Sequence, residues 1–460
     1  MNKRAVFCGL GLLVLLSRLC HLNILWIEEG YPSAAAIQML HGAIPYRDFW
    51  FDKPPLFPAA YLLWGGWTGL PLRLAGALFV MACAWMIYKF AREWWGEREG
   101  LIAATLLVFS FVFWIPSAVM TLAPDLLMVL PHLAAVYFAW RKQPFLSGIL
   151  AGVSVCLNSK GIFVLAACLV WNPAGFLPLL AGFVIPNAIA LAIFREPYID
   201  QVWRWGYIYS ANTFVGIPRR EGAMRTLHWF GFHAAITAGA VWYWWKCRGE
   251  GATRSFLWLI LSLMGVAAGL RFFPRYYFQL VPVMALVGAR GIAQMKWPAA
   301  ALLLLVLPVA RFGPRYAILA NDLIHGRDHN WVDLTMNQDS RDASAIVKKA
   351  SRPGDTLLVW GYRPDVFSYT RLRAGTFFLD SQPLTGVLAD RHLISTEQLF
   401  PALAARNRVV LSQTNPTFVV DGLGPYNPPL AITQYEDLRE WLSHYAEIGR
   451  TAHSVVYQRR

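Results

Sequence analysis

The chain alternates long apolar segments with short polar breaks from its N-terminus to about residue 312. The first apolar run, Ala5–Trp26, approaches the roughly 20 residues that an α-helix needs to span a bilayer. Together with this run, about eleven transmembrane helices are predicted, the others near 71–91, 100–116, 121–140, 145–158, 161–172, 176–194, 229–246, 255–270, 276–290 and 297–312. An odd number of spans places the two termini on opposite sides of the membrane.

The region 145–172 decides the topology downstream of it. Asn158-Ser159-Lys160 interrupts two short apolar pieces, and a single bent span there would reverse every later segment. Two spans are favoured because they leave Arg271–Tyr277 and the C-terminal segment on the same side as Glu28. We interpret Lys160 as an interfacial anchor on the cytoplasmic side. Asn2-Lys3-Arg4 before the first run also fits a cleaved signal peptide, but an uncleaved anchor is favoured.

The composition changes from about Gly313, where Asp, Arg, His and Asn replace the leucine runs. Buried or alternating apolar runs predict strands at Thr356–Trp360, Thr417–Asp421 and Ser454–Gln458, and helical patterns occur at Ser340–Ala350, Thr396–Asn407 and Tyr435–Tyr445. Strands that alternate with helices indicate a soluble α/β domain. We therefore expect a transmembrane module over 1–315, with a first outer loop over 27–70, and an extracytoplasmic domain over 316–460. No glycine-rich phosphate loop, nucleophile elbow or HExxH motif occurs in this tail, so no catalytic chemistry is assigned to it.

Composition and charge agree with a polytopic α-helical membrane protein. Hydrophobic residues make up 57% of the chain and charged residues 15%, and the mean hydropathy is +0.41, values that do not fit a water-soluble chain of this length. The net charge of +14 is scattered between apolar runs, which disfavours nucleic acid and favours anionic lipids and phosphorylated lipid substrates as partners. The six cysteines show no disulfide framework or CxxC metal spacing. The basic loops predict a cytoplasmic N-terminus by the positive-inside rule, through Lys89, Arg92, Arg98, Arg141, Lys142, Lys246, Arg248 and Lys296.

The first polar break carries the residues best suited to chemistry. Glu28 and Glu29 end the first apolar run, and Tyr31–Leu40 fits a short helix at the membrane interface that would hold them where a lipid headgroup lies. Asp52 precedes Lys53, whose ammonium is followed by two prolines that restrict the backbone. A positioned ammonium stabilises the negative charge that grows on a departing phosphate. A helix-capping acid and a snorkelling lysine are the alternative interpretation of the same residues.

Three further positions are candidates on the same predicted side. Asp125 stands at the outer start of a span, where it can cap the helix or line a donor pocket. Arg271 and Arg275 flank a proline at a membrane end, which suits either phosphate contact or an interfacial anchor. A hydroxyl or amine that attacks an anomeric carbon needs a base within about 3 Å, which Glu28 can supply.

Several motifs in order resemble those of the GT-C membrane glycosyltransferases, most closely the branch of protein O-mannosyltransferases and bacterial aminoarabinose transferases that modify lipid A. The likeness runs from the first span to about residue 290, and Asp355–Gly361 resembles the extracytoplasmic domain of bacterial members. The motifs are Glu28-Glu29-Gly30-Tyr31, Gly42 to Asp48, Asp52-Lys53-Pro54-Pro55, Ala123-Pro124-Asp125 and Arg271 to Pro282.

The resemblance implies an inverting glycosyltransferase, a hexosyl- or pentosyltransferase that moves a sugar from a polyprenyl phosphate to a lipid, glycan or protein acceptor at the outer face of a bacterial inner membrane. It makes residues 1–315 the GT-C-like catalytic module. Glu28 maps to the candidate base, where family members usually have Asp, and Glu29 remains a second candidate. Lys53 maps to a donor-phosphate contact, and Asp52, Asp125 and Tyr276 are expected to line the substrate pocket. Arg271 and Arg275 are expected to contact the same phosphate because their charges lie on the same predicted side, although family members often have His where Arg275 stands.

Two other classes stay open from the sequence. A polytopic transporter or lipid flippase also carries charges within the membrane, although internal repeats between the halves are not found and the charges here gather at one face. A noncatalytic lipid-binding protein of the same fold is the third interpretation. No metal ligand set is predicted, and a divalent cation held by carboxylates and the donor phosphate stays open as a cofactor. The sugar and the acceptor are not specified by these residues.

Overall fold

The computed structural model describes residues 2–212, 219–327, 329 and 331–460, and these form two compact units. The helical unit comprises Met1–Leu22, Lys53–Phe57 and Arg73–Arg327, and the sheet unit comprises Asn23–Asp52, Pro58–Leu72 and Asp328–Arg460. Most of the predicted outer loop 27–70 therefore groups with the C-terminal residues. The predicted boundary at 315/316 does not take this grouping into account, because sequence order does not show which segments pack together.

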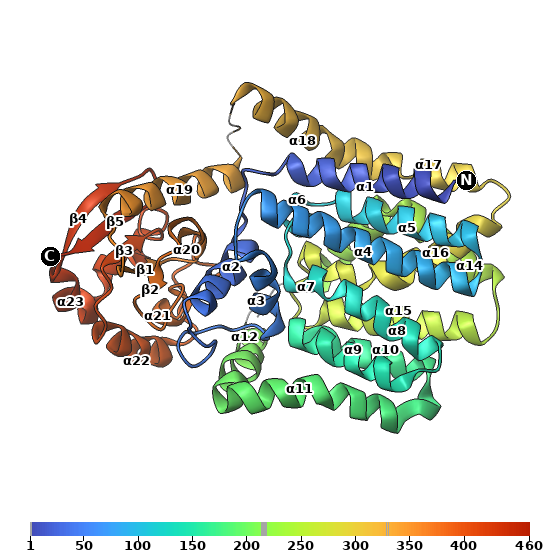
Figure 1. The fold of residues 1–460 in the computed structure, drawn as a ribbon, viewed down its shortest axis with the longest axis horizontal. Helices are drawn as coiled ribbons and strands as arrows, with labels where there is room; N and C mark the ends of the chain where they lie inside the picture. Colours follow the sequence, from blue (N-terminus) through green and yellow to red (C-terminus); the bar gives the residue numbers. More distant parts are fainter. Residues whose placement is uncertain (1, 213–218, 328, 330) are drawn as a thin grey trace. The chain divides into compact units, whose positions relative to one another are not determined.

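The helical unit is built from α-helices that lie side by side in Figure 1, with short 3₁₀ or π segments between some of them. Every range predicted to span the membrane contains helix. In chain order the elements are α1 (Lys3–Leu19), α4 (Leu70–Trp94), α5 (Glu97–Val112), α6 (Pro116–Val119), α7 (Pro124–Leu127), α8 (Val129–Trp140), α9 (Pro144–Leu157), η2 (Ser159–Gly161), α10 (Ile162–Trp171), η3 (Pro173–Gly175), α11 (Phe176–Tyr198), η4 (Ile199–Arg204), α12 (Trp205–Asn212), α13 (Arg219–Phe232), α14 (Ala234–Lys246), α15 (Glu250–Ala267), η5 (Pro274–Gln279), α16 (Val281–Gln294), α17 (Pro298–Leu303) and α18 (Val306–His325).

Three helical stretches in the described part of the chain are long and apolar enough to cross a bilayer. They are Leu70–Trp94, Pro173–Ser210 and Pro298–His325. Shorter apolar helices are Pro124–Trp140, Pro144–Leu157, Ser159–Trp171 and Val281–Gln294. The helical membrane class is confirmed, whereas the predicted number of about eleven spans stays a prediction.

Close contacts between glycine faces join several of these helices. A Cβ added to Gly239 of α14 would stand 2.3 Å from the carbonyl oxygen of Gly288 on α16, and one on Gly291 would stand 1.8 Å from that of Gly239. Small residues let helix backbones approach closely, which is the usual packing mode where lipid removes the hydrophobic driving force between helices. In the sequence, this packing is indicated by Gly288 and Gly291, which are three residues apart and therefore lie on one face of α16.

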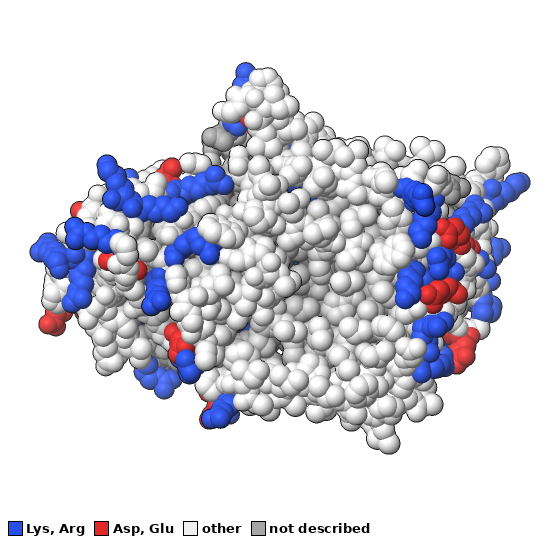
Figure 2. Space-filling model, viewed as in Figure 1, with Lys and Arg blue, Asp and Glu red and all other residues white. Residues whose placement is uncertain are grey.

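Charged side chains gather at one end of the helical unit (Figure 2), over the end where Figure 1 places the N-terminus. The Lys3 ammonium lies 4.7 Å from the ring centroid of Tyr88, and the Tyr88 hydroxyl donates to Glu97 over 2.8 Å. Glu93 accepts from Tyr137 and pairs with Arg141 at 3.6 Å. The structure thus places the basic loops after α4 and α8 at the same end as the basic N-terminus, as the charge pattern predicted.

The sheet unit holds a five-stranded sheet in the order β2-β1-β3-β5-β4. β1 (Thr356–Trp360) runs parallel to β2 (Arg373–Ala374) and β3 (Phe418–Asp421), and β5 (Val455–Arg459) pairs antiparallel with β3 and with β4 (Tyr445–Arg450). The other elements are α2 (Ile27–Leu40), α3 (Leu56–Tyr61), η1 (Leu62–Trp64), α19 (Val332–Ala350), α20 (Asp365–Thr370), α21 (Gln382–Thr385), α22 (Pro401–Ser412), η6 (Pro428–Leu430), η7 (Ile432–Gln434), η8 (Glu436–Leu438) and α23 (Arg439–Ser443). The predicted strands correspond to β1, β3 and β5.

Two expectations for the sheet unit need correction. The helix expected over Tyr435–Tyr445 is only the short η8 and α23, and Tyr445 begins β4, an edge strand with exposed residues that no apolar run announces. α2 begins at Ile27 rather than at Tyr31, so Glu28 and Glu29 lie inside its first turn. Residues 29–38 of α2 are buried, unlike a helix that rests on a lipid surface with one exposed face.

Candidate active site

An ion cluster forms in the helical unit where three chain breaks meet. Asp125 lies in the first turn of α7, after Pro124 at the first helical position. Asn158 ends α9 with an extended backbone, and its side-chain oxygen accepts from the amide of Lys160 over 3.1 Å. Arg275 lies in η5, which the proline at 274 begins. Polar residues at these breaks are thereby brought together from positions up to 150 residues apart.

Asp125 is the centre of the cluster. Its carboxylate accepts from Asn158 Nδ2 over 3.1 Å and lies 3.6 Å from Lys160 Nζ and 3.5 Å from Arg275 Nε. The Asp125 side chain is 4% exposed and that of Lys160 is 12% exposed. The Lys160 ammonium also lies over the ring of Tyr276. Asp125 therefore orients two cations, and its helix-capping interpretation is wrong because Ala123 occupies the cap position.

Arg271 is held beside this cluster by two other helices. Its guanidinium lies 3.8 Å from the ring centroid of Tyr209 on α12 and donates to the Tyr209 hydroxyl. Its backbone oxygen accepts from Arg225 Nη1 on α13 over 3.1 Å. Arg271 is only 5% exposed, which contradicts the interfacial-anchor interpretation, since an anchoring arginine extends into the headgroup region.

Lys160 has an unusual acid–base environment. Burial lowers its pKa to about 7, Asp125 opposes this effect, and the positive charges of Arg275 and Arg271 add to it. The interpretation of Lys160 as an interfacial anchor is therefore wrong, because packing buries the ammonium against a carboxylate and an aromatic ring. A lysine with this pKa gains or loses its proton near neutral pH, and a bound anion would favour the charged form.

The acidic pair lies in the sheet unit. Glu28 is half-buried and Glu29 is fully buried in the first turn of α2. The cap residue is Trp26, which makes no side-chain cap hydrogen bond. Carboxylates in a first helical turn are stabilised by the helix dipole, but neither glutamate occupies the capping position itself.

Asp52 lies close to the acidic turn of α2 through Tyr31. The Asp52 amide donates to the Tyr31 hydroxyl over 3.3 Å, and the Tyr31 ring stacks on Phe51 with centroids 4.6 Å apart. Burial raises the pKa of Tyr31 above its ordinary value, and the negative charges of Asp52 and Asp380 add to this. Two carboxylates thus lie near one phenol. Lys53, the next residue, is the first of the segment Lys53–Phe57 that groups with the helical unit.

Sequence reasoning missed Asn158, Tyr209 and Asp380 and misread Lys160. An ionisable residue inside an apolar stretch indicates a functional site. Lys160 is such a residue, so the sequence did contain a signal for its role. Asp380 lies in the tail, to which no chemistry was assigned. No three His, Cys, Asp or Glu side chains of the described residues gather closely enough to suggest a metal site.

A comparison with protein families gives a match that covers part of the chain. Residues 52–194 match the family model described as dolichyl-phosphate-mannose-protein mannosyltransferase. No curated protein sequence matches the chain. The matched segment includes Asp52, Lys53, Asp125 and Lys160, whereas Glu28 and Arg271 lie outside it.

Solved structures resemble the whole chain. ArnT from Cupriavidus metallidurans bound to undecaprenyl phosphate superposes with a TM-score of 0.65 at 13% identity, covering 98% of this chain and 97% of that one. The oligosaccharyltransferase AglB from Archaeoglobus fulgidus, in complex with an inhibitory peptide and a dolichol-phosphate, gives a TM-score of 0.51 at 13% identity, covering 100% of this chain and 74% of that one. These matches confirm the resemblance to the GT-C glycosyltransferases and their O-mannosyl- and aminoarabinose transferase branch, at the level of the fold.

Proposed function

We propose that this chain is an inverting glycosyltransferase that moves a hexosyl or pentosyl group from a polyprenyl-phosphate donor to an acceptor at the outer face of a bacterial inner membrane. The observation that carries the proposal is the pairing of Lys160 and Arg275 with Asp125 at a break between helices, where the charge of Arg271 also acts on Lys160. Buried and partly buried cations of this kind suit a phosphate group, which arginine and lysine bind by charge-assisted hydrogen bonds.

The cations act on the leaving group. When the bond between the anomeric carbon and the phosphate oxygen breaks, the electron pair stays on the polyprenyl phosphate. A preorganised cation in a water-poor site stabilises this charge more than water does. Each charge-assisted hydrogen bond contributes about 1.5–3 kcal/mol. In this proposal Asp125 keeps Lys160 and Arg275 in position and takes no proton, and Tyr276 shapes the pocket through its contact with Lys160.

The acceptor is activated by Glu28. Its carboxylate removes the proton of an acceptor hydroxyl or amine while the acceptor oxygen or nitrogen bonds to the anomeric carbon, and a single displacement inverts that carbon. Glu28 is the better candidate because it is half-buried, whereas the fully buried Glu29 has less access to a substrate. Lys53 is proposed as a further donor-phosphate contact and Asp52 as a group that orients the acceptor.

The comparisons support the donor class. The family model is described by a dolichyl-phosphate-linked sugar, and the ArnT and AglB structures hold undecaprenyl phosphate and dolichol-phosphate. In our proposal the N-terminus is cytoplasmic and the residues 316–460 are extracytoplasmic. The basic loops gathered at the N-terminal end of the helical unit fit this orientation.

Mass spectrometry tests the proposal directly. The purified protein is incubated with a panel of polyprenyl-phosphate sugars and a membrane extract that supplies acceptors, and each donor is followed together with the released polyprenyl phosphate. We expect one donor to be consumed, and Glu28→Gln to lower the rate by about 10²–10⁴-fold while donor binding is retained. Unchanged transfer by Glu28→Gln with loss in Glu29→Gln would assign the base to Glu29. Movement of intact donor between the leaflets of proteoliposomes without its consumption would instead identify a transporter.

A further inference from the structure

The helix that carries the acidic pair is held near both of its ends by the C-terminal part of the sheet unit. At its far end, Gln38 donates to Leu372 O over 3.2 Å and accepts from Ala374 N over 2.7 Å. In its first turn, Gly30 contacts α20 so closely that an added Cβ would stand 2.9 Å from the Cβ of Asp365. α2 is therefore closely packed and hydrogen-bonded against residues that lie more than 300 positions away in sequence.

The residues that lead into α2 are held by hydrogen bonds from side chains of α19. The Asn337 side chain, on α19, accepts from Leu25 N over 3.1 Å and donates to Asn23 O over 2.9 Å. Arg341, one turn further along α19, donates to the same Asn23 oxygen over 2.6 Å. One turn earlier on α19, Asp333 accepts from the indole nitrogen of Trp26, the cap residue of α2, over 3.2 Å. Three positions on α19 thus hold Asn23, Leu25 and Trp26, three of the four residues before the helix.

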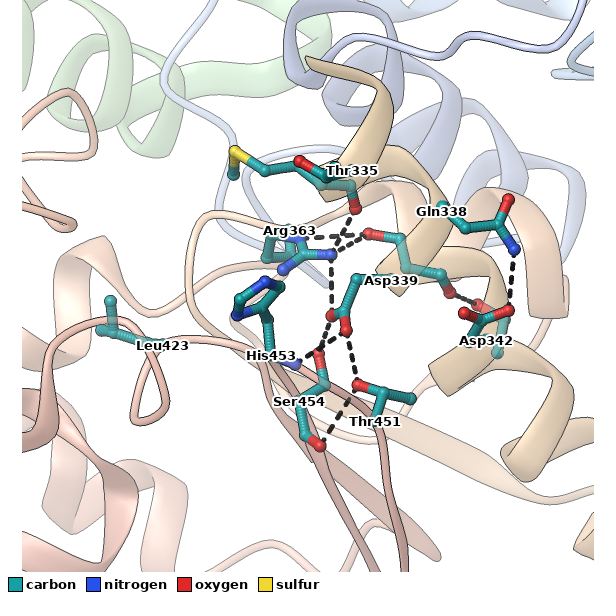
Figure 3. A network of polar contacts seen from close by, with 12 residues as sticks. Thr335, Gln338, Asp339, Asp342, Arg363, Leu423, Thr451, His453 and Ser454 are labelled. Carbon is teal, nitrogen blue, oxygen red and sulfur yellow. Dashed lines mark hydrogen bonds and ion pairs between the residues drawn. The ribbon is translucent and has the colours of Figure 1, made fainter. Parts of the chain in front are cut away.

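α19 is itself immobilised on the sheet by a buried polar network, shown in Figure 3. Asp339 accepts from Thr451 Oγ1 over 2.6 Å, from His453 N over 2.8 Å and from Ser454 Oγ over 2.6 Å, all in the turn between β4 and β5. Arg363, which follows β1, pairs with Asp339 at 3.3 Å, and both side chains are 3% exposed. Burial acts to raise the pKa of Asp339, but these hydrogen bonds and Arg363 hold it below its ordinary value.

We propose that Asn337 is a positioning residue for the transfer reaction, acting through the acidic turn of α2. A hydrogen-bonded path leads from the sheet through Asp339 to α19, and from Asn337 to residues 23–26 and the first turn of α2. This inference rests on the proposed function and adds to it a role for the C-terminal domain. The domain sets the direction in which Glu28 and Glu29 project, because the backbone before a short helix determines where its first turn points. Catalysis depends steeply on such placement, since a misplacement of about 1 Å can cost about 10²-fold in rate.

Asn337→Asp tests the contact with an isosteric change. Asp cannot donate, so its second oxygen would face the Asn23 carbonyl and repel it. The matched control is Gln338→Ala on the same helix, because Gln338 is exposed and its amide donates to Asp342 instead. We expect Asn337→Asp to lower kcat by about 10- to 100-fold with the KM for the donor changed less than about threefold, and Gln338→Ala to match the wild type.

Two readouts separate positioning from a general loss of structure. In a double-mutant cycle with Glu28→Gln, or with Glu29→Gln if that residue proves to be the base, Asn337→Asp should have no further effect on the rate. Hydrogen exchange of the peptides covering residues 23–40 should be faster in Asn337→Asp and unchanged in Gln338→Ala.

Equal losses of rate in both backgrounds, or faster exchange with unchanged kcat, would overturn the positioning role. Unchanged exchange would overturn the contact itself. An inactive wild type would refute the proposed function and, with it, the catalytic part of this inference, while hydrogen exchange would still decide the contact.

Discussion

Replacing Lys160 with Met removes one cation from the proposed phosphate site with little change in shape. Lys160 is buried between Asp125 and the ring of Tyr276, so an unbranched apolar side chain fits the same space. Asp125 keeps its contacts with Arg275 and Asn158 in the variant. We therefore expect folding to be retained and donor affinity to fall.

The size of the loss follows from the charge of the lysine. A hydrogen bond from a charged donor contributes about 1.5–3 kcal/mol, and each 1.4 kcal/mol is about tenfold in Kd. Lys160→Met should therefore weaken binding by about 10- to 100-fold at a pH where the wild-type ammonium is protonated.

The pH dependence gives a sharper test. The pKa of Lys160 is lowered to about 7, with burial as the largest cause. A bound phosphate favours the ammonium and raises this pKa, so binding takes up a proton when the pH exceeds about 7. Wild-type affinity should be greatest below the pKa and should weaken as the pH rises, by at most about tenfold per unit. It should level off at the affinity of Lys160→Met, whose binding should not change with pH in this range.

Isothermal titration calorimetry in detergent measures both quantities. A polyprenyl phosphodiester is the suitable ligand from about pH 6 to about pH 9, because its single charge does not titrate there. The control is Lys142→Met, since Lys142 donates to Trp171 O over 3.2 Å and follows α8 at the basic end of the helical unit. Wild-type binding that does not change with pH, or a pH slope that persists in Lys160→Met, would refute this account of the site.

Two further predictions concern stability, each read from the melting temperature in detergent. Asp125→Asn removes the negative charge that Lys160 and Arg275 share, so the free energy of unfolding should fall by about 3–5 kcal/mol. The fall should be larger at pH 6 than at pH 9, because Lys160 is neutral at the higher pH. Equal losses at the two pH values would contradict the assigned titration of Lys160. Gly30→Ala places a Cβ 2.9 Å from Asp365 and should destabilise by about 1–3 kcal/mol, whereas Gly9→Ala, on α1 with no atom within 4 Å, should be neutral or stabilising. A Gly30→Ala protein as stable as the wild type would show that α2 does not need its close contact with α20.

Particular elements show how far sequence patterns reach. Thr356–Trp360 was predictable as a strand because this central strand of the sheet has its last four side chains buried, on both faces, which requires an unbroken apolar run. β4 was not, because this edge strand exposes half of its residues and follows directly on a helical pattern. α2 was expected as a helix, but its burial against α20 depends on the single small residue Gly30, whose role only the packing reveals.

The candidate site divides in the same way. Glu28, Lys53, Asp125 and Arg271 were visible because ionisable groups are costly in a bilayer and stand out among apolar residues. Asn337 gave no such signal, since a polar residue on a polar helix is unremarkable until its partners are known.

The amino-acid order alone was sufficient for the membrane class, for the helical segments and for naming candidate site residues, because these follow from local hydrophobicity and side-chain type. The folded chain decided which charges meet. Lys160 changed from an anchor to a partner of Asp125, and Asn337 became the residue that holds the entry to α2. The reason is physical: the energy of a charge or a hydrogen bond depends on distance and burial, and both arise only when segments remote in sequence pack together.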